Sequence, residues 1–173
     1  MALTVALLAV VFVPMLIEAQ RAAVNEQFQR EQGGVEAPGD VYQAMRIAYP
    51  LTFLAMIGEQ AVRGSASAAL VAAGLLVFVA AKALKWWAIV SLGGFWTFRV
   101  ITRPGAALVT SGPYRFIRHP NYVAVVGELA GVALMSAAWV AGPVSVVLFG
   151  WLILKRIAIE ERALQIVQTL SKG

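Results

Sequence analysis

Long runs of apolar residues limit the folds open to this chain. Residues 2–17 carry no charged side chain, and further apolar runs cover residues 47–62, 66–92 and 122–154 with few polar interruptions. A helix needs about 20 predominantly apolar residues to cross a bilayer. Hydrophobic residues make up 60% of the chain, charged residues make up 13%, and the mean hydropathy is +0.77. These values indicate an integral membrane protein.

The four runs predict five membrane helices. Residues 2–17 would rise roughly 24 Å as a helix, and Glu18 to Gln20 would extend it at the interface. The alternative of a cleaved signal peptide requires a basic residue before the run, whereas the first one is Arg21. Residues 122–154 are too long for one helix, and Gly142-Pro143 predicts a hairpin that turns around 141–143. We therefore expect an all-α fold, a polytopic membrane helix bundle.

The chain reads as one membrane-embedded domain, residues 1–173. Residues 1–92 would form three spans, and residues 93–173 would form a loop, the hairpin and a C-terminal helix. We interpret Lys82, Lys85 and the pair Trp86-Trp87 as interfacial anchors near the end of the third span. Small residues on the helices could serve self-association or internal packing, so the oligomeric state stays open.

The loop charges predict the orientation. Thirteen of the fourteen Lys and Arg residues fall on one side of this arrangement, and only Arg63 falls on the other. The positive-inside rule then places the N-terminus outside and the C-terminus in the cytoplasm. Topology and attraction to anionic membrane lipids explain the net charge of +5, so we expect no nucleic-acid partner.

The rarest residue types restrict the chemistry. The chain has no cysteine, and His119 and Asp40 are the only histidine and aspartate. Disulfides, thiolate metal sites and cysteine nucleophiles are thereby excluded, and a His-rich metal site or a Ser-His-Asp triad is improbable. We expect no metal. Any reaction must rely on Arg, Glu, Tyr, Asn, one His and the backbone.

Polar groups gather in residues 109–122, VTSGPYRFIRHPNY. Turn residues occupy 110–113, and Pro120 favours an extended conformation at His119, so we expect residues 93–121 to form a structured cytoplasmic loop with little regular structure. Its arginines, tyrosines and histidine could recognise an anionic or nucleoside-like ligand. These residues are Tyr114, Arg115, Arg118, His119 and Tyr122. Taken singly, each also fits the ordinary cations and aromatics of a membrane interface.

A second polar element, RIAIEERAL, covers residues 156–164. Arg156 and Glu160 are four residues apart, so they share a helix face and could form a plain salt bridge. Glu161 would then be an additional acid that could receive a cationic amine or sulfonium, with Arg156 free to hold a carboxylate.

The elements GPYRFIRHPNY and RIAIEERAL, one hydrophobic hairpin apart, resemble the isoprenylcysteine carboxyl methyltransferase family of membrane methyltransferases. The family pattern is an Arg-His-Pro-x-Tyr element and a Glu-Glu element, and the resemblance runs from about Ala83 to Leu164. Arg21, Asn25, the turn at 33–36 and Tyr42 resemble the bacterial branch that includes alkylpyrone O-methyltransferases. Tyr49 stands where that branch has a histidine, which leaves the substrate open.

The resemblance implies S-adenosylmethionine as the cofactor, bound at the cytoplasmic end of the hairpin. His119, Pro120 and Tyr122 would lie against it, Glu160 or Glu161 would hold its amino group, and the backbone around 108–112 would meet the adenine. The cofactor's carboxylate, ammonium and sulfonium suit Arg, Glu and aromatic side chains. The cofactor-binding candidates are Leu108, Val109, Gly112, Tyr114, His119, Pro120, Tyr122, Arg156, Glu160 and Glu161.

Methyl transfer needs alignment of the reacting atoms and exclusion of water, and no covalent nucleophile. A carboxylate acceptor is already ionised near neutral pH, whereas an enol or phenol needs a base. The catalytic candidates are Arg118, His119, Glu59 and Glu128. Glu59 and Glu128 lie inside predicted spans, where pairing with Asn25 or Arg46 is the structural alternative.

The acceptor would be a lipophilic small molecule or a prenylated substrate that enters laterally from the bilayer. Phe95, Trp96 and Phe98 could line its path, although we favour an anchoring role for them. Two other functions stay open at this point. One is an NADPH-dependent membrane reductase of the sterol type, and the other is a non-catalytic lipid-binding membrane protein.

Overall fold

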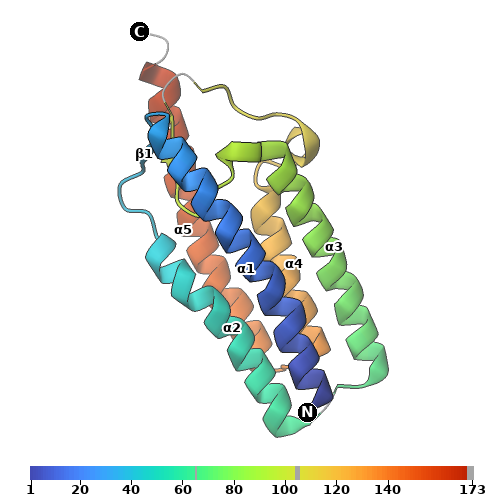
Figure 1. Cartoon of the computed structure of the whole chain (residues 1–173). Helices are drawn as coiled ribbons and strands as arrows, with labels where there is room; N and C mark the ends of the chain where they lie inside the picture. Colours follow the sequence, from blue (N-terminus) through green and yellow to red (C-terminus); the bar gives the residue numbers. More distant parts are fainter. Residues whose placement is uncertain (65, 104–105, 171–173) are drawn as a thin grey trace.

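Five helices run alternately up and down in one bundle (Figure 1). The computed structural model describes residues 1–64, 66–103 and 106–170, with side chains described as far as residue 165. The five helices are α1 (Ala2–Glu31), α2 (Tyr42–Arg63), α3 (Ala68–Leu92), α4 (Pro120–Met135) and α5 (Ala141–Leu170). The short 3-10 helices η1 (Gly93–Phe95) and η2 (Gly112–Arg115) lie between α3 and α4. The fold is all-helical apart from β1 (Val35–Glu36), which pairs antiparallel with β2 (Ile101–Thr102).

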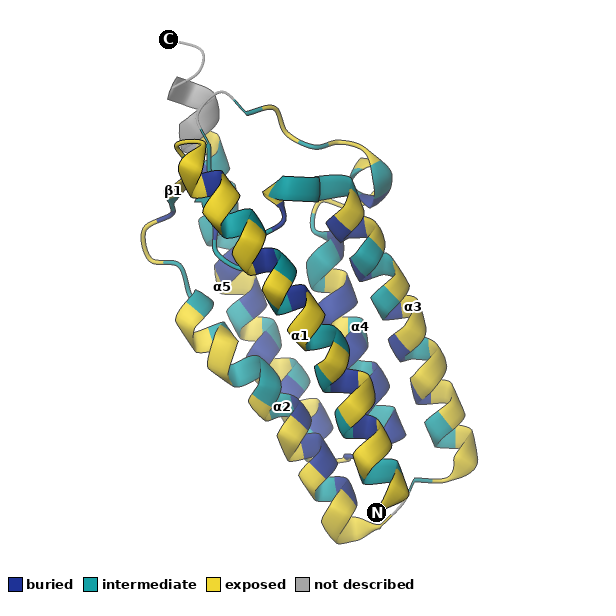
Figure 2. Cartoon of the chain, in the orientation of Figure 1, coloured by how far each residue is buried: buried dark blue, intermediate teal, exposed yellow. Residues whose placement is uncertain are grey.

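Of the five membrane helices predicted from the sequence, three are long and apolar enough to cross a membrane among the described residues, namely Ala2–Glu31, Ala68–Phe95 and Ala141–Gln165. The helix α4 is also apolar but is shorter. Exposed residues lie on the outward faces of the bundle (Figure 2), and many of them are apolar, such as Leu76 and Val147. Such faces suit contact with lipid. These features indicate a multi-pass membrane protein.

The core is built from large apolar side chains contributed by every helix. Leu7, Phe53, Phe78, Leu129 and Phe149 come from α1, α2, α3, α4 and α5 respectively, and each is buried in one cluster. Because each helix supplies part of the same cluster, the bundle has one continuous interior.

The turn of the predicted hairpin lies slightly earlier than expected. The chain reverses over residues 136–140, where Ala137 takes a positive φ of 47°. Gly142 and Pro143 instead occupy the first turn of α5. Proline is tolerated there because the first helical N–H groups have no partner within the helix. The first helix is also longer than its apolar run, since α1 continues to Glu31.

Glycines bring α3 and α4 into close contact. A Cβ atom at Gly131 would lie 2.8 Å from the Phe78 backbone nitrogen, and one at Gly74 would lie 2.6 Å from the Gly131 carbonyl oxygen. A Cβ at Gly127 would similarly meet the Cβ of Ala81 at 2.8 Å. Within the bundle, these small residues therefore serve internal packing, in the way small residues do between membrane helices.

The interpretation of Lys82 and Lys85 as interfacial anchors is wrong. Both ammonium groups point into the bundle, where Lys82 lies 2.8 Å from Glu18 and 3.1 Å from Glu128. Lys85 lies 2.7 Å and 3.3 Å from the same two carboxylates. Tyr49 donates a hydrogen bond to Glu128. Two acids and two bases thus neutralise one another inside the bundle, because unpaired charges there would be costly.

Glu59 and Glu128 do not have the partners that the sequence suggested. Glu128 belongs to the charge cluster just described, and Asn25 instead donates to the carbonyl oxygens of Gly93 and Trp96. Glu59 accepts hydrogen bonds from the backbone N–H groups of residues 140 and 141 and forms an ion pair with Arg63. Glu59 therefore caps the start of α5.

Candidate functional site

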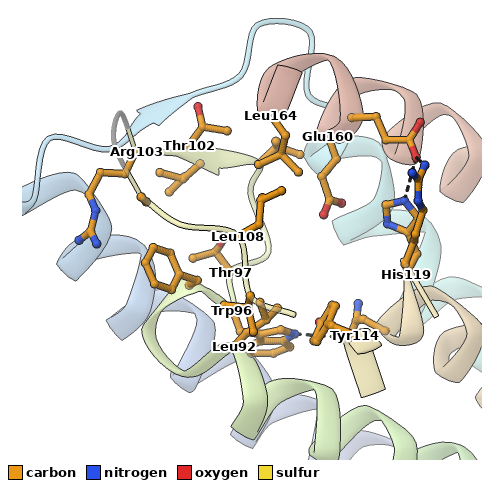
Figure 3. Close-up of a pocket in the computed structure, with 18 of the residues that line it drawn as sticks. Leu92, Trp96, Thr97, Thr102, Arg103, Leu108, Tyr114, His119, Glu160 and Leu164 are labelled. Atoms are coloured by element: carbon orange, nitrogen blue, oxygen red, sulfur yellow. Dashed lines mark hydrogen bonds and ion pairs between the residues drawn. The ribbon is translucent and has the colours of Figure 1, made fainter. Parts of the chain in front are cut away.

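A pocket of about 550 Å³ lies at one end of the bundle, where the loop between α3 and α4 meets the C-terminal half of α5 (Figure 3). Its size is within the range of small-molecule sites. One wall is formed by residues within 92–103 and 106–114, and the other by α5 and the start of α4. Its lining residues include Phe95, Trp96, Arg99, Val100, Leu108, Val109, Tyr114, Arg118, His119, Asn121, Tyr122, Arg156, Glu160, Glu161 and Leu164.

The α3–α4 loop is fastened to α1 by side-chain hydrogen bonds. Asn25 donates to the carbonyl oxygens of Gly93 and Trp96 at 3.1 and 2.7 Å, and Gln29 donates to the Gly94 carbonyl oxygen at 2.8 Å. The Glu26 carboxylate accepts from the backbone N–H groups of residues 98 and 99. These bonds satisfy loop backbone groups that strand or helix partners would otherwise satisfy. The first helix therefore sets the position of one pocket wall.

Gly112 and Pro120 shape the chain beside the pocket. Gly112 has a φ of 60°, and a Cβ atom there would lie only 2.0 Å from the Ser91 hydroxyl oxygen on α3. Pro120 occupies the first turn of α4, and His119 precedes it with a φ of −127°. With its ψ of 61°, this backbone lies outside the helical region, which a residue before proline avoids. The two residues thus allow η2 to pack on α3 and direct His119 toward α5.

A chain of polar contacts leads into the pocket from its base. The Tyr122 hydroxyl donates to Glu160 at 2.7 Å and accepts from the Arg156 Nε at 3.0 Å. The Arg156 Nη1 donates to Asp40 at 2.6 Å. The expected helical salt bridge of Arg156 with Glu160 is thus replaced by an ion pair with Asp40, and the two residues meet only through Tyr122. The Glu160 carboxylate points into the pocket (Figure 3).

The second acid of the pair has different partners. The Glu161 carboxylate lies 3.2 Å from the His119 Nε2 and 3.8 Å from the Arg118 Nη1. Arg118 itself is largely exposed at the pocket rim. The two adjacent glutamates on α5 therefore have different surroundings: Glu160 contacts the phenol of Tyr122, and Glu161 contacts the imidazole of His119.

Aromatic rings contribute flat apolar surface to the same pocket. Trp96 is buried, and its indole N–H donates to the Asn121 side-chain oxygen at 3.3 Å. Phe98 packs edge-on against Trp96 and serves as support. Burial, and then the nearby Glu160 carboxylate, raises the pKa of Tyr114 well above its ordinary value. The Tyr114 hydroxyl therefore stays protonated at neutral pH and can donate a hydrogen bond.

Most of the site residues predicted from the sequence meet in this pocket. The residues that line it are Leu108, Val109, Tyr114, Arg118, His119, Tyr122, Arg156, Glu160 and Glu161. Gly112 and Pro120 lie beside it and set its backbone. Glu128 lies in the charge cluster of the bundle interior, and Glu59 lies near the α4–α5 turn at the other end of the bundle.

Several residues that line the pocket were not predicted from the sequence. Arg99, Val100 and Thr102 follow α3 in a segment that the sequence indicated only as loop, and Asn121 belongs to the element GPYRFIRHPNY without having been a candidate. Phe95 and Trp96 also line the pocket, and Trp96 packs against Ala22 and Ile89, which anchors the loop to α1 and α3. The sequence did not predict that Asp40 contacts the site, because its partner Arg156 is 116 residues away in the chain. The one available signal was that a lone aspartate occurs in a chain poor in charge.

Comparisons with known proteins agree with the motifs. The model of the isoprenylcysteine carboxyl methyltransferase family matches residues 72–166. The chain is 30% identical over 159 residues to the protein called uncharacterized protein YpbQ of Bacillus subtilis (strain 168). That match covers 92% of this chain and 95% of the relative. No solved structure matches the chain.

Proposed function

The chain belongs to the isoprenylcysteine carboxyl methyltransferase family, and from that premise we propose that it is an S-adenosylmethionine-dependent O-methyltransferase acting on a lipophilic substrate. The observation that carries the proposal is the pocket where both family elements meet. Tyr122 and His119 from the first element contact Glu160 and Glu161 from the second. The two elements therefore form one site, which a ligand could bridge.

The residues of the pocket fit the chemical groups of S-adenosylmethionine. Its ammonium would be held by Glu160, because that carboxylate points into the pocket and already accepts a hydrogen bond from Tyr122. Arg118 and Arg103 offer guanidinium groups for its carboxylate. Trp96 and Tyr114 offer ring faces to the adenine and to the sulfonium. When bound, the cofactor would supply an electrophilic methyl group.

The residues of the chain would accelerate transfer by alignment and by keeping water out. Methyl transfer is an in-line displacement at carbon, so the acceptor oxygen must be held in line with the methyl carbon and the sulfur. Leu108, Val109 and Leu164 line the pocket with apolar side chains, which exclude water from that line. His119 lies at the pocket edge, 3.2 Å from Glu161, and could accept a proton from an enol or phenol.

Glu59 and Glu128 are left out of the proposed machinery. Two lysines and Tyr49 occupy the Glu128 carboxylate, and neither acid lines the pocket. We assign both to stability. An acceptor carboxylate would need no base, so an ester could form without His119. An enol or phenol would give an ether, and His119 would then accept its proton.

The acceptor class and the orientation follow from the membrane setting. A multi-pass bundle with apolar outer faces presents its site to molecules dissolved in the bilayer, so we propose a lipophilic acid or phenol, isoprenylcysteine-like or polyketide-like. The pocket lies at the bundle end opposite Arg63. By the positive-inside rule, we propose that this end faces the cytoplasm, with the N-terminus outside.

Calorimetric titration of the detergent-purified protein with S-adenosylhomocysteine, and separately with NADPH, tests the proposed cofactor. We expect binding of S-adenosylhomocysteine alone. Binding of NADPH alone would replace the proposal with a membrane reductase. The absence of heat with both compounds, in a protein that still shows cooperative thermal unfolding, would favour a non-catalytic lipid-binding protein.

A further inference from the structure

Asp40 lies outside the pocket but contacts two parts of its wall. Its carboxylate accepts a hydrogen bond from the Val100 backbone N–H at 2.8 Å and another from the Arg156 Nη1 at 2.6 Å. It also accepts from the Tyr42 backbone N–H at 3.1 Å, which fixes it at the start of α2. The Asp40 side chain is 3% exposed and that of Arg156 is 7% exposed. Both partners of this ion pair are therefore largely withdrawn from water.

Arg156 links Asp40 to the pocket residue Tyr122. Its Nη1 binds Asp40, while its Nε donates to the Tyr122 hydroxyl at 3.0 Å. A guanidinium is planar and rigid, so fixing one nitrogen also fixes the direction of the other. With its acceptor capacity directed at Arg156, the Tyr122 hydroxyl points its own proton at Glu160, 2.7 Å away.

We infer that Asp40 is a positioning residue of this site, which holds Arg156 and Tyr122 so that the Glu160 carboxylate is presented to the ammonium of an adenosyl amino-acid ligand. The inference rests on the proposed function. It extends the site to the α1–α2 connection, which lies before the region matched by the family model. The start of α2 thereby becomes part of the ligand site.

The chemistry of an aspartate suits this role better than a neutral residue would. Asp40 offers two acceptor oxygens, and both are used, one by Val100 and one by Arg156 together with Tyr42. An asparagine keeps only one acceptor oxygen and replaces the other with a donor. It would leave the buried Arg156 without a counter-charge, and the Arg156 Nε would no longer be held against the Tyr122 hydroxyl.

The test is the affinity of the purified full-length protein for S-adenosylhomocysteine in a double-mutant cycle of Asp40→Asn and Tyr122→Phe. We expect Asp40→Asn alone to weaken binding on the order of tenfold, the size typical of a lost hydrogen bond to a charged group. In the Tyr122→Phe background, which lacks the hydroxyl link, Asp40→Asn should change affinity by less than about twofold. A matched control is Glu31→Gln, which removes the same charge from an exposed side chain at the end of α1.

Two results of this cycle would contradict the inference. One is an affinity of Asp40→Asn equal to that of the wild type. The other is a double variant whose loss of affinity equals the product of the two single losses, which would show that Asp40 does not act through Tyr122. If Asp40→Asn does not fold, Arg156→Lys replaces it, since an ammonium cannot reach Asp40 and Tyr122 with the same fixed geometry; wild-type affinity of that variant would overturn the inference. A wild-type protein that does not bind the compound would overturn the proposed function, and this inference with it.

Discussion

The Lys85 ammonium lies between two carboxylates, 2.7 Å from Glu18 and 3.3 Å from Glu128, and the Lys85 side chain is 3% exposed. Lys82 contacts the same two acids at 2.8 and 3.1 Å. A cluster of two acids and two bases has no net charge, so each member is tolerated in the bundle interior only while the others are present. Single residues of the cluster therefore carry a large share of the stability.

We predict that Lys85→Met destabilises the protein by about 3–5 kcal/mol, because it leaves Glu18 and Glu128 with one cation between them. The measurement is the thermal unfolding midpoint in detergent. Lys155→Met is the matched control, since Lys155 is exposed and rests on the Trp151 ring. Equal midpoints for the two variants would show that the cluster does not stabilise the fold.

Lys82 and Lys85 also illustrate which contacts cannot be predicted from the sequence around a residue. Lys82 and Lys85 stand beside two tryptophans near the end of an apolar run, and that pattern indicates an interface. Their acids lie on α1 and α4, which are 64 and 43 residues away in the chain. Local pattern cannot reveal such pairing. His119 and Tyr122 were predicted to lie at one site because both belong to one short motif, and both line the pocket.

At the scale of elements, α3 and α4 approach more closely than ordinary side chains allow. Gly131 and Gly74 face one another across this interface, and a methyl group on either would meet the opposite backbone below 3.0 Å. Lys85 and Glu128, which close the charge cluster, also lie on this helix pair. The close approach thus sets how the interior charges meet.

Gly131→Ala should therefore destabilise the protein by about 1–3 kcal/mol through overpacking. Gly150→Ala is the matched control, because a Cβ atom at Gly150 on α5 would meet nothing within 4 Å. Alanine there should leave stability unchanged or raise it slightly, since alanine favours a helix more than glycine does. The comparison uses thermal unfolding in the same detergent, and a loss of stability in both variants alike would contradict the packing argument.

Hydropathy predicted where the helices lie better than where they end, since α1 continues to Glu31 and α5 to Leu170, beyond their apolar runs. The apolar runs predicted five membrane helices; the described residues form five α-helices, of which three are long and apolar enough to cross a membrane. The hairpin turn was placed around 141–143, whereas it lies at 136–140, because Gly142-Pro143 is compatible with the start of a helix as well as with a turn. The pairing of β1 with β2 was missed, since two-residue strands leave no periodic pattern.

At the scale of the whole molecule, the N-terminal half and the C-terminal half build one site. The family elements lie in the second half, yet Asn25, Glu26 and Gln29 hold the loop wall, and Asp40 holds Arg156. The pocket residues that belong to the two motifs could be predicted, whereas those in the segment after α3, such as Arg99 and Val100, could not. Their support could not, because it depends on contacts between residues that are 60 to 116 positions apart.

The measurement that tests the account most directly is the affinity for S-adenosylhomocysteine of three proteins, the wild type, Glu160→Gln and His119→Ala, by calorimetry in detergent. We predict that the wild type binds and that Glu160→Gln binds at least about tenfold more weakly, since the charge offered to the ligand ammonium is lost. His119→Ala should also bind more weakly, while both variants keep the thermal midpoint of Glu31→Gln. Binding by both variants as tight as that of the wild type would contradict the assignment of this pocket as the cofactor site.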